Sequence, residues 1–268
     1  MPLHIIACVK QVPDPEAPAS AFRVDEAAKK VVAAAGVTPV ISQFDALAVE
    51  AALRIKDAAS DAKITVISLG PETARDVVKH SLAMGADEGV LLTDSAFDGD
   101  SYTTALALSK AIEKIGDYNL VLCGRQATDW DAGVVGYGIA EMLGVSSVSL
   151  AKSVTVQGDK VIVERVLMEG YDTIEAPLPA LVTVSNELGE PRYPKLQQIM
   201  MAARKQVTIW GAGDLGLDAS KVGAGAVRMN LERLFQPVSE VECEIVEGET
   251  PDEVATKLAQ RLREQKII

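Results

Sequence analysis

The chain has 268 residues, of which 48% are hydrophobic and only 4% aromatic, and its formal net charge is −12. This length fits one large domain or two modest ones, and a core rich in Val, Ile, Leu and Ala is typical of buried parallel strands covered by helices. The negative charge argues against nucleic acid and anionic membranes as non-specific partners, because both attract a basic surface.

Four predicted strands alternate with four predicted helices in the first half of the chain. The strands are 4–12, 63–70, 88–94 and 118–124, and the helices are 42–59, 72–86, 100–116 and 132–144. Ser42 stands at the N-cap position of the first helix. Between the first strand and this helix, residues 22–36 form a hairpin or a short helical excursion. The alternation predicts an α/β fold with a doubly wound, mainly parallel sheet of the Rossmann-like type.

The pattern changes after residue 145. Period-two alternation over residues 148–186 predicts a β-hairpin insertion and a strand that returns to the sheet. A loop and a short helix follow within 187–210. The tail is rich in glycine and ends in a helix with Thr250 as N-cap and Pro251 at the first helical position. We therefore predict a nucleotide-binding α/β domain over 1–205 and an extended C-terminal arm and helix over 206–268.

The sequence offers no sign of a membrane span or of a signal peptide. No apolar run reaches about 18 residues, and the apolar part of MPLHIIACVKQVPDPE is too short for a signal peptide. Cys8, Cys123 and Cys243 are far apart and fit no metal or redox spacing. We expect no direct membrane insertion and a cytoplasmic location, since a reducing compartment suits free cysteines.

The stretch LVLCGRQATDWDAGVVGYGIAEMLG, residues 120–144, is the main candidate site. Ligands of parallel sheets bind beyond the carboxyl ends of the strands. Gly124 permits close approach of a ligand, and Gly133 and Gly136 precede or begin a helix whose free N–H groups attract phosphate. Asp129 and Asp131 are able to accept hydrogen bonds from sugar hydroxyls or an adenine amine. These residues indicate a nucleotide site, with ordinary turn chemistry as the alternative.

Catalytic machinery is not evident in the sequence. Neither GxGxxG nor the P-loop pattern occurs. His4 is expected to be structural and His80 to lie at the surface, and no Ser/His/Asp or Cys/His set is visible. We predict no catalytic residue and no metal ligand. The chain is then a binder or carrier, not an enzyme, in which a cofactor supplies the chemistry.

Four motifs, in order and spacing, resemble electron transfer flavoprotein (ETF) beta subunits over residues 4–216. They are CGRQATDWDAGVVG, ISQFDALAVEAALRIK, SLGPETARDVVKHSLAMGAD and LPALVTVSNELGEPRYPKLQQIMMAARK. The chain departs from the family pattern at Ser42-Gln43, where Asn-Pro is usual, and at Met168 and Asp172. Trp130 and Val134 are unusual within the nucleotide loop. We interpret these departures as subfamily variation.

The resemblance implies a heterodimer with an ETF alpha subunit, on which the C-terminal arm packs. FAD lies mainly on the alpha subunit, and the beta subunit buries a second nucleotide, either AMP or a second FAD. Transferred residue by residue, this second site comprises Cys8, Ser42, Gln43, Phe44, Asp45, Leu69, Gly124, Arg125, Gln126, Ala127, Thr128, Asp129, Asp131, Ala132, Gly133, Val134 and Gly136.

The same resemblance implies that a docking segment contacts acyl-CoA dehydrogenases, with an ETF:quinone oxidoreductase as a further partner. Leu196 takes the place of the family's anchoring leucine, flanked by the basic residues Lys195, Arg204 and Lys205. A surface helix with an ordinary basic edge is the alternative. The predicted docking residues are Glu190, Pro191, Arg192, Tyr193, Leu196, Ile199 and Met200.

The choice between AMP and a second FAD depends on the stretch LLTDSAFDGDSYTTALAL, residues 91–108. It is similar to the loop that holds the flavin diphosphate in electron-bifurcating members of the family, and the residues concerned are Thr93, Asp94, Gly99, Ser101 and Thr104. Asp98 and Asp100 argue against an anion there. Both nucleotides stay open, as does NADH-dependent bifurcation.

Two other functions are compatible with such a sheet. One is a stand-alone adenine-nucleotide-binding enzyme or sensor, but CVKQVPDPE offers no phosphate-activating motif after the first strand. The other is a structural subunit with an empty site, which the loop from Gly124 to Gly136 argues against.

Overall fold

The computed structural model describes residues 3–59, 61–218, 220–237 and 243–268. The chain forms two compact units. The first comprises the residues up to Arg23 together with Val31–Glu232, and the second comprises Val24–Lys30 and Arg233–Ile268. The first unit extends beyond position 205, where we predicted the arm to begin, because residues 208–210 continue its sheet.

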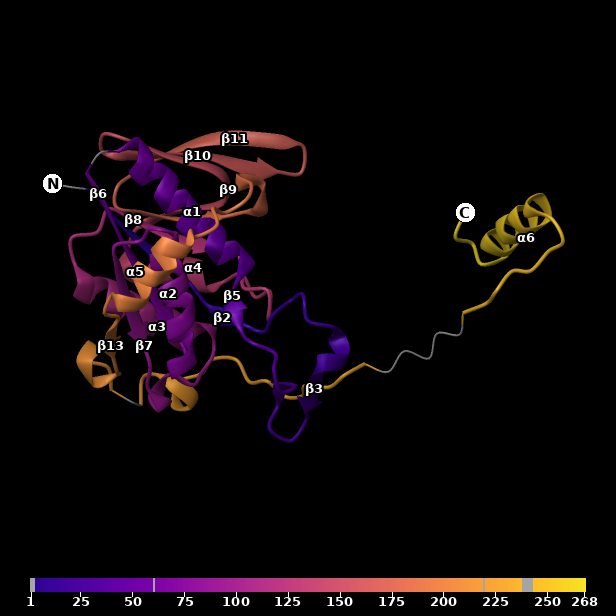
Figure 1. Ribbon diagram of the computed structural model, residues 1–268, viewed down its shortest axis with the longest axis horizontal. Helices are drawn as coiled ribbons and strands as arrows, with labels where there is room; N and C mark the ends of the chain where they lie inside the picture. Colours follow the sequence, from indigo (N-terminus) through magenta and orange to yellow (C-terminus); the bar gives the residue numbers. More distant parts are fainter. Residues whose placement is uncertain (1–2, 60, 219, 238–242) are drawn as a thin grey trace. The chain divides into compact units, whose positions relative to one another are not determined.

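A nine-stranded sheet forms the centre of the first unit, in the order β11-β10-β9-β12-β8-β1-β6-β7-β13 (Figure 1). From β9 to β13 in this order all neighbours are parallel, whereas β10 and β11 are antiparallel additions at one end. The strands are β1 (Leu3–Cys8), β6 (Ala62–Leu69), β7 (Glu88–Leu92), β8 (Leu120–Gly124), β9 (Ser146–Gln157), β10 (Lys160–Leu167), β11 (Gly170–Pro177), β12 (Ala180–Val184) and β13 (Thr208–Trp210).

Helices cover both faces of this sheet, which confirms the predicted doubly wound α/β fold. Side chains of α1 and α2 pack on one face, and those of α3 and α4 pack on the other. The helix α5 lies against α2. The bounds are α1 (Gln43–Ala58), α2 (Arg75–Met84), α3 (Ser101–Ile115), α4 (Val135–Leu143), α5 (Leu196–Arg204) and, in the second unit, α6 (Pro251–Glu264).

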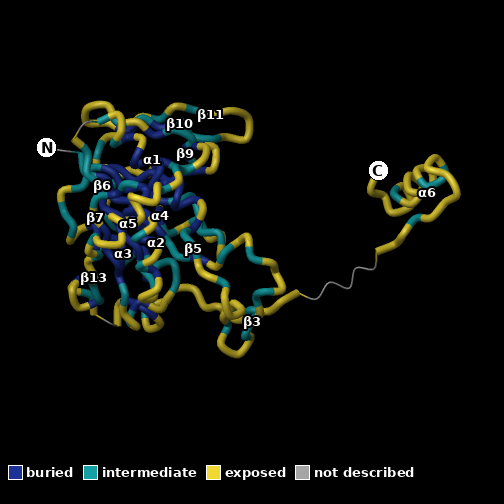
Figure 2. Tube along the Cα trace, in the orientation of Figure 1, coloured by how far each residue is buried: buried dark blue, intermediate teal, exposed yellow. Residues whose placement is uncertain are grey.

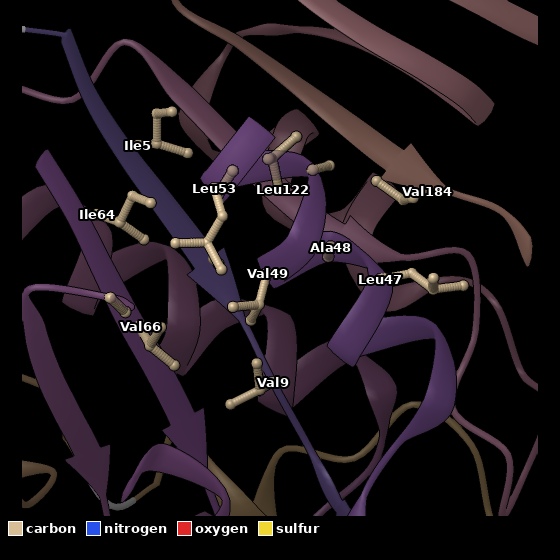
Figure 3. Close-up of a cluster of buried hydrophobic side chains, with 14 of the residues drawn as sticks. Ile5, Val9, Leu47, Ala48, Val49, Leu53, Ile64, Val66, Leu122 and Val184 are labelled. Carbon is tan, nitrogen blue, oxygen red and sulfur yellow. The ribbon is translucent and has the colours of Figure 1, made fainter. Parts of the chain in front are cut away.

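The helix α1 shows how the sequence builds this packing. Alanine-rich sequence favours a helix, and the side chains at helical spacing are buried against the central strands. The alternate residues of the strands supply the other side of the contact. Figure 3 shows this cluster, with Ile5, Val9, Leu47, Ala48, Val49, Leu53, Ile64, Val66, Leu122 and Val184 labelled.

The predicted insertion is longer than a hairpin. Its strands β9, β10 and β11 form an antiparallel meander, and β12 then returns to the sheet beside β8. β9 also pairs in parallel with β12. Its twelve residues therefore serve both the sheet and the meander.

Four short strands lie outside the main sheet. β2 (Gln11–Val12) pairs with β5 (Val40–Ile41), and β3 (Phe22–Asp25) forms a separate sheet with β4 (Lys30–Ala33). The second pair confirms the hairpin, rather than the helical excursion, within residues 22–36.

The second unit contains α6, which begins as predicted. The Thr250 hydroxyl accepts a hydrogen bond from the Glu253 N–H at 3.3 Å, and Pro251 is the first helical residue. None of the residues of α6, all of them described, is buried (Figure 2). The predicted packing of this arm on an alpha subunit stays a prediction, and its residues 219 and 238–242 lie outside the described part of the chain.

Candidate functional site

The carboxyl ends of the parallel strands β8, β1, β6 and β7 meet at one edge of the sheet, as predicted. β8 and β7 are three strand spacings apart, or ~14 Å, so the candidate residues fall into two groups. The β1/β8 cluster comprises Cys8, Ser42, Gln43, Phe44, Asp45 and Gly124–Gly136, and the β6/β7 cluster comprises Leu69, Thr93, Asp94, Gly99, Ser101 and Thr104. A ligand that contacts both clusters must span this distance.

Asp45 holds the β1/β8 cluster together. Its two carboxylate oxygens accept hydrogen bonds from the backbone N–H groups of Lys10, at 2.9 Å, and Gly124, at 3.0 Å. Burial raises the pKa of Asp45 to about 7, and these N–H groups offset only part of that shift. The start of α1 is thereby fixed against the ends of both central strands.

The close packing of Gly124 against Asp45 and Phe44 requires a glycine at this position, whether or not a ligand binds. A Cβ atom at this position would lie 2.5 Å from Asp45 Oδ1 and 2.7 Å from the carbonyl carbon of Phe44. Real Cβ atoms do not approach backbone this closely. The structure therefore gives Gly124 a packing role in addition to the ligand approach that the sequence predicts.

The two predicted ligand-binding acids of the loop both have partners within the protein. Lys10 Nζ lies 2.6 Å from Asp129 Oδ2, and Gln126 Nε2 donates to Asp131 Oδ1 at 2.8 Å. Asp131 has φ of 50°, in the left-handed region, as has Gly133 with φ of 63°. The loop thus has a defined conformation that these side chains stabilise.

Three buried donor groups of the β1/β8 cluster have no hydrogen-bond partner among the described residues. They are the hydroxyls of Ser42 and Thr128 and the Nε of Arg125. The Arg125 guanidinium stacks on the Phe44 ring, 4.7 Å from its centroid, which places it beside the start of α1. Buried polar groups are nearly always paired, so this cluster fits a ligand rich in acceptors, such as the phosphate and ribose of a nucleotide.

Ser42 occupies the N-cap position of α1, but its side chain makes no capping hydrogen bond. Its backbone carbonyl accepts the N–H groups of Asp45 and Ala46, both at 3.0 Å, and its hydroxyl makes no cap hydrogen bond. The side-chain cap predicted from the sequence is therefore absent. The hydroxyl is left for another acceptor or donor.

Cys8 and Cys123 lie on neighbouring strands, although they are far apart in the sequence. Both are buried in the cluster of side chains beneath α3 and α4. A hydrogen bond with the Cys8 thiol and burial together raise the pKa of Cys123 well above its ordinary value. A high pKa disfavours the reactive thiolate, in agreement with the predicted role as core or pocket-lining residues.

The β6/β7 cluster is covered by a later part of the chain. Asp94 accepts hydrogen bonds from the N–H groups of Ala96 and Ala212, both at 3.0 Å, and these lower its pKa. Gly99 lies so close to Gly223 that an added Cβ would be 3.1 Å from the Gly223 Cα. Residues within 211–218 and 220–229 therefore form one wall of this cluster.

Asp100 links Arg228 and Met229 of this wall to the start of α3 through hydrogen bonds. It accepts the N–H groups of Thr103 at 3.0 Å, Arg228 at 2.7 Å and Met229 at 2.9 Å. Burial acts to raise the pKa of Asp100, but the three N–H groups outweigh it, and the pKa lies below its ordinary value. The Asp100 carboxylate, whose negative charge argues against anion binding here, thus already accepts hydrogen bonds from three backbone N–H groups.

The predicted docking segment, Glu190–Arg204, leads into α5 and exposes apolar side chains. Tyr193 is 93% exposed, Leu196 74% and Met200 57%. Ile199 is also exposed, whereas Ala202 is buried against α2. This amphipathic arrangement leaves a contiguous apolar face free on the outside of α5.

Arg192 is the one predicted docking residue whose charge is engaged inside the chain. Its guanidinium pairs with Glu50 of α1, Nε to Oε2 at 2.8 Å, and with Asp57 at 2.8 Å. Burial acts to raise the pKa of Glu50, but hydrogen bonds from Arg192 and Arg54 lower it below its ordinary value. The Glu50 carboxylate in turn raises the pKa of Arg192.

Sequence reasoning missed Lys10 and Glu50 as parts of these sites. Lys10 follows a strand that ends at the candidate edge, which was a usable signal. Glu50 lies within the apolar face of a predicted helix, between Leu47 and Leu53. A charged residue in such a position signals a buried partner, but nothing local identifies Arg192.

A cavity of about 660 Å³ lies elsewhere, between α1 and β9. It is lined by Leu3 and Asn119, which are at or before the amino ends of β1 and β8. None of the predicted site residues lines it, and it offers no cluster of buried unpaired donors.

The described part of the chain shows neither a metal-binding group of side chains nor a membrane-spanning helix. No group of three or more His, Cys, Asp or Glu side chains there has the arrangement to hold a metal ion. None of the helices described is long and apolar enough to cross a membrane.

Comparison with known proteins matches a family model described as "Electron transfer flavoprotein domain" to residues 29–215. The "Electron transfer flavoprotein subunit beta" of Thermoanaerobacterium thermosaccharolyticum is 41% identical over 99% of this chain and 100% of its own length. The subunit of the same name from Megasphaera elsdenii is 36% identical, with the same coverage of both chains. The "Caffeyl-CoA reductase-Etf complex subunit CarD" of Acetobacterium woodii is 37% identical, again over 99% and 100%.

Proposed function

The chain belongs to the electron transfer flavoprotein family, and from this premise we propose that it is the beta subunit of a heterodimeric electron carrier. Its partner is an alpha subunit that holds FAD. The chain itself buries an adenine nucleotide, AMP or a second FAD, at the carboxyl edge of its sheet. The flavin, when bound, supplies the electron-transfer chemistry. The role of this chain is to bind the nucleotide, to orient the flavin and to shield it from solvent.

One observation carries the nucleotide proposal: the unpartnered buried donors of Ser42, Arg125 and Thr128 beside the start of α1. An anion or a ribose hydroxyl would satisfy them, and the N-terminal end of a helix favours negative charge. Asp45 fixes this helix end relative to Gly124. The role of Asp45 is then to position the site.

The choice of nucleotide follows from which clusters it occupies. A mononucleotide contacts the β1/β8 cluster alone. A dinucleotide has the length to continue over the ~14 Å to the β6/β7 cluster, where Ser101 and Thr104 begin α3. Both alternatives use the same adenosine site, and they differ in the number of flavins per heterodimer.

For the docking partner, we propose a dehydrogenase that acts on acyl-CoA. The exposed apolar face of α5 supports a protein contact, because exposed Tyr, Leu and Met side chains suit a transient interface. One relative is named as part of a complex with a caffeyl-CoA reductase, which also acts on a CoA thioester. The cytoplasm remains the predicted compartment.

The first experiment counts nucleotides. The chain is co-expressed with its alpha subunit, the purified complex is denatured, and the released nucleotides are quantified by chromatography. One FAD with one AMP supports the mononucleotide alternative, and two FAD support the dinucleotide alternative. A complex with a single FAD and no other nucleotide would reject the proposed site.

A variant pair links that count to the observed donors. Ser42→Ala removes a hydroxyl with no partner in the chain, so we expect lower nucleotide content without loss of stability. Ser81→Ala is the matched control, since the buried Ser81 hydroxyl donates to the Val77 carbonyl at 2.9 Å. Equal nucleotide content in the Ser42→Ala and wild-type complexes would exclude this hydroxyl from the site.

A further inference from the structure

The docking segment is held at both ends by contacts with side chains or backbone far away in the sequence. At its start, Arg192 is bound to Glu50 through three hydrogen bonds, one of them from its backbone N–H at 3.1 Å. The Glu50 side chain is only 6% exposed. Its carboxylate also accepts from Arg54 Nε at 2.9 Å, so it has charged donors on two sides.

The end of α5 is held by two lysines that act reciprocally. Lys79 of α2 donates from Nζ to the backbone carbonyls of Ala202 and Ala203, both at 3.0 Å, and of Lys205. Lys205, which follows α5, donates to the carbonyls of Ala86, at 2.7 Å, and Asp87, just beyond α2. Each lysine thus adds a charged donor to backbone carbonyls at or just beyond the end of the other helix.

We infer that Glu50 is a positioning residue for docking, which together with Lys79 and Lys205 fixes the apolar face of α5 before a partner binds. This inference rests on the proposed docking function of that face. Glu50 touches no partner itself. It acts through Arg192, whose guanidinium is turned inward to the α1 carboxylates and is therefore not free to pair with a partner.

The reason for such an arrangement is the short length of α5. A helix of nine residues is marginal by itself in water, and its buried contact is small because Ala202 alone of its residues is buried. An interface side chain that is mobile must be ordered upon binding, at a cost in conformational entropy. Fixing both ends of the segment lowers that cost.

The test uses the complex with its alpha subunit and a purified acyl-CoA dehydrogenase that reduces it. The variants are Glu50→Gln and Lys205→Met, which loosen opposite ends of the segment. We expect each to raise the dehydrogenase concentration at half-maximal rate by about tenfold, which corresponds to ~1.4 kcal/mol. The limiting rate and the rate of reduction by dithionite should stay unchanged, because neither residue touches the proposed nucleotide site.

Two readouts separate positioning from general damage. Hydrogen exchange of the amides in Glu190–Arg204 should quicken in Glu50→Gln, beginning with Arg192, while exchange in β1 and β8 is unchanged. Lys205→Arg should restore docking that Lys205→Met loses, since arginine retains donors for the same carbonyls. Glu141→Gln, at an exposed helix position on α4, is the control for loss of one negative charge.

The Leu196→Ala variant separates a failure of the positioning inference from a failure of the docking proposal on which that inference rests. If Leu196→Ala weakens docking but Glu50→Gln and Lys205→Met remain within twofold of the wild type, the positioning inference is wrong and the docking proposal stands. If Leu196→Ala itself has no effect on the half-maximal concentration, the docking proposal is wrong.

Discussion

Asp45 and Glu50 are two buried acids of the same helix, α1, and their pKa values shift in opposite directions. Asp45 is 7% exposed and has backbone N–H groups as its donors, and its pKa rises to about 7. Glu50 is 4% exposed and pairs with Arg192 and Arg54, and its pKa falls. Desolvation is the largest single influence on the pKa at both positions, but only at Glu50 do guanidinium partners outweigh it. The comparison shows that a charged partner in hydrogen-bond contact decides whether the protein stabilises the charged form of a buried acid.

The two acids also belong to different sites. Asp45 lies at the edge of the sheet where we propose that a nucleotide binds, whereas Glu50 holds the segment proposed for docking. Their opposite titration means that acid and alkali should affect the two regions unequally.

The largest expected effect is on the pH dependence of stability at Asp45. Since its folded pKa is raised from 3.8 to about 7, the folded chain binds the proton more tightly than the unfolded chain. The stabilisation is present below pH ~4 and is lost as the pH rises towards 7, by up to ~4 kcal/mol in total. Asp45→Asn should remove this slope, measured by urea unfolding between pH 4 and 8. Parallel curves for both proteins would show that Asp45 does not titrate in this range.

Gly124→Ala should destabilise the same region by about 1–3 kcal/mol, because the added methyl group overlaps Asp45 and Phe44 and forces the start of α1 away from β8. Thermal unfolding of the purified chain measures the loss, and nucleotide content of the complex should fall as well. Gly213→Ala is the matched control, since a Cβ there meets nothing within 4 Å. An equal loss in both variants would mean that glycine flexibility, and not the contact with α1, explains the effect.

Glu50→Gln should show the opposite pH behaviour, at a cost of about 1–2 kcal/mol near neutral pH, since Arg192 is partly exposed and water screens part of its interaction. The folded pKa of Glu50 is lowered, so its contribution is present above its unfolded pKa of 4.5 and is lost as the pH falls below that value. The difference in unfolding free energy between wild type and variant should therefore shrink in acid. A difference that grows in acid would contradict the ion-pair account.

Lys10→Met should have the smallest effect on stability, below about 1 kcal/mol, because the Lys10 side chain is 42% exposed in its pair with Asp129. Lys10 lowers the pKa of Asp45 and Asp129 raises it. Removing Lys10 should therefore move the pH midpoint of the Asp45 slope upwards. An unchanged midpoint would show that the Lys10 charge is too well screened to reach Asp45.

The parts of the fold that follow from local patterns were predictable. Four strands alternating with helices, the return of β12 and the cap of α6 all follow from periodicity and capping residues. β13 was not predicted, because three residues beside a glycine-rich segment carry no periodic signal. The meander was predicted as a single hairpin, since period-two alternation marks strands but does not count them.

The gathering of the candidate residues at one edge of the sheet was predictable, but their contacts with one another were not. Strand ends and glycines indicated the carboxyl edge, and the motif resemblance indicated the residues. The roles of Asp45 and Glu50 depend on partners 79 and 142 positions away. Such pairings arise only when the sheet and helices are assembled. No spacing rule within α1 distinguishes the acid whose pKa is raised from the acid whose pKa is lowered.

Lys79 and Lys205 also determine which parts of the chain are needed to reproduce the proposed docking surface in another molecule. Lys79 of α2 donates to a carbonyl at the end of α5, and Lys205 donates to a carbonyl just beyond α2, so each helix end is supported by the other. A synthetic peptide of residues 190–204 therefore lacks what orders it. A competitor for the dehydrogenase, or a graft of this surface onto another scaffold, has to carry α2 and the Glu50 portion of α1 with it.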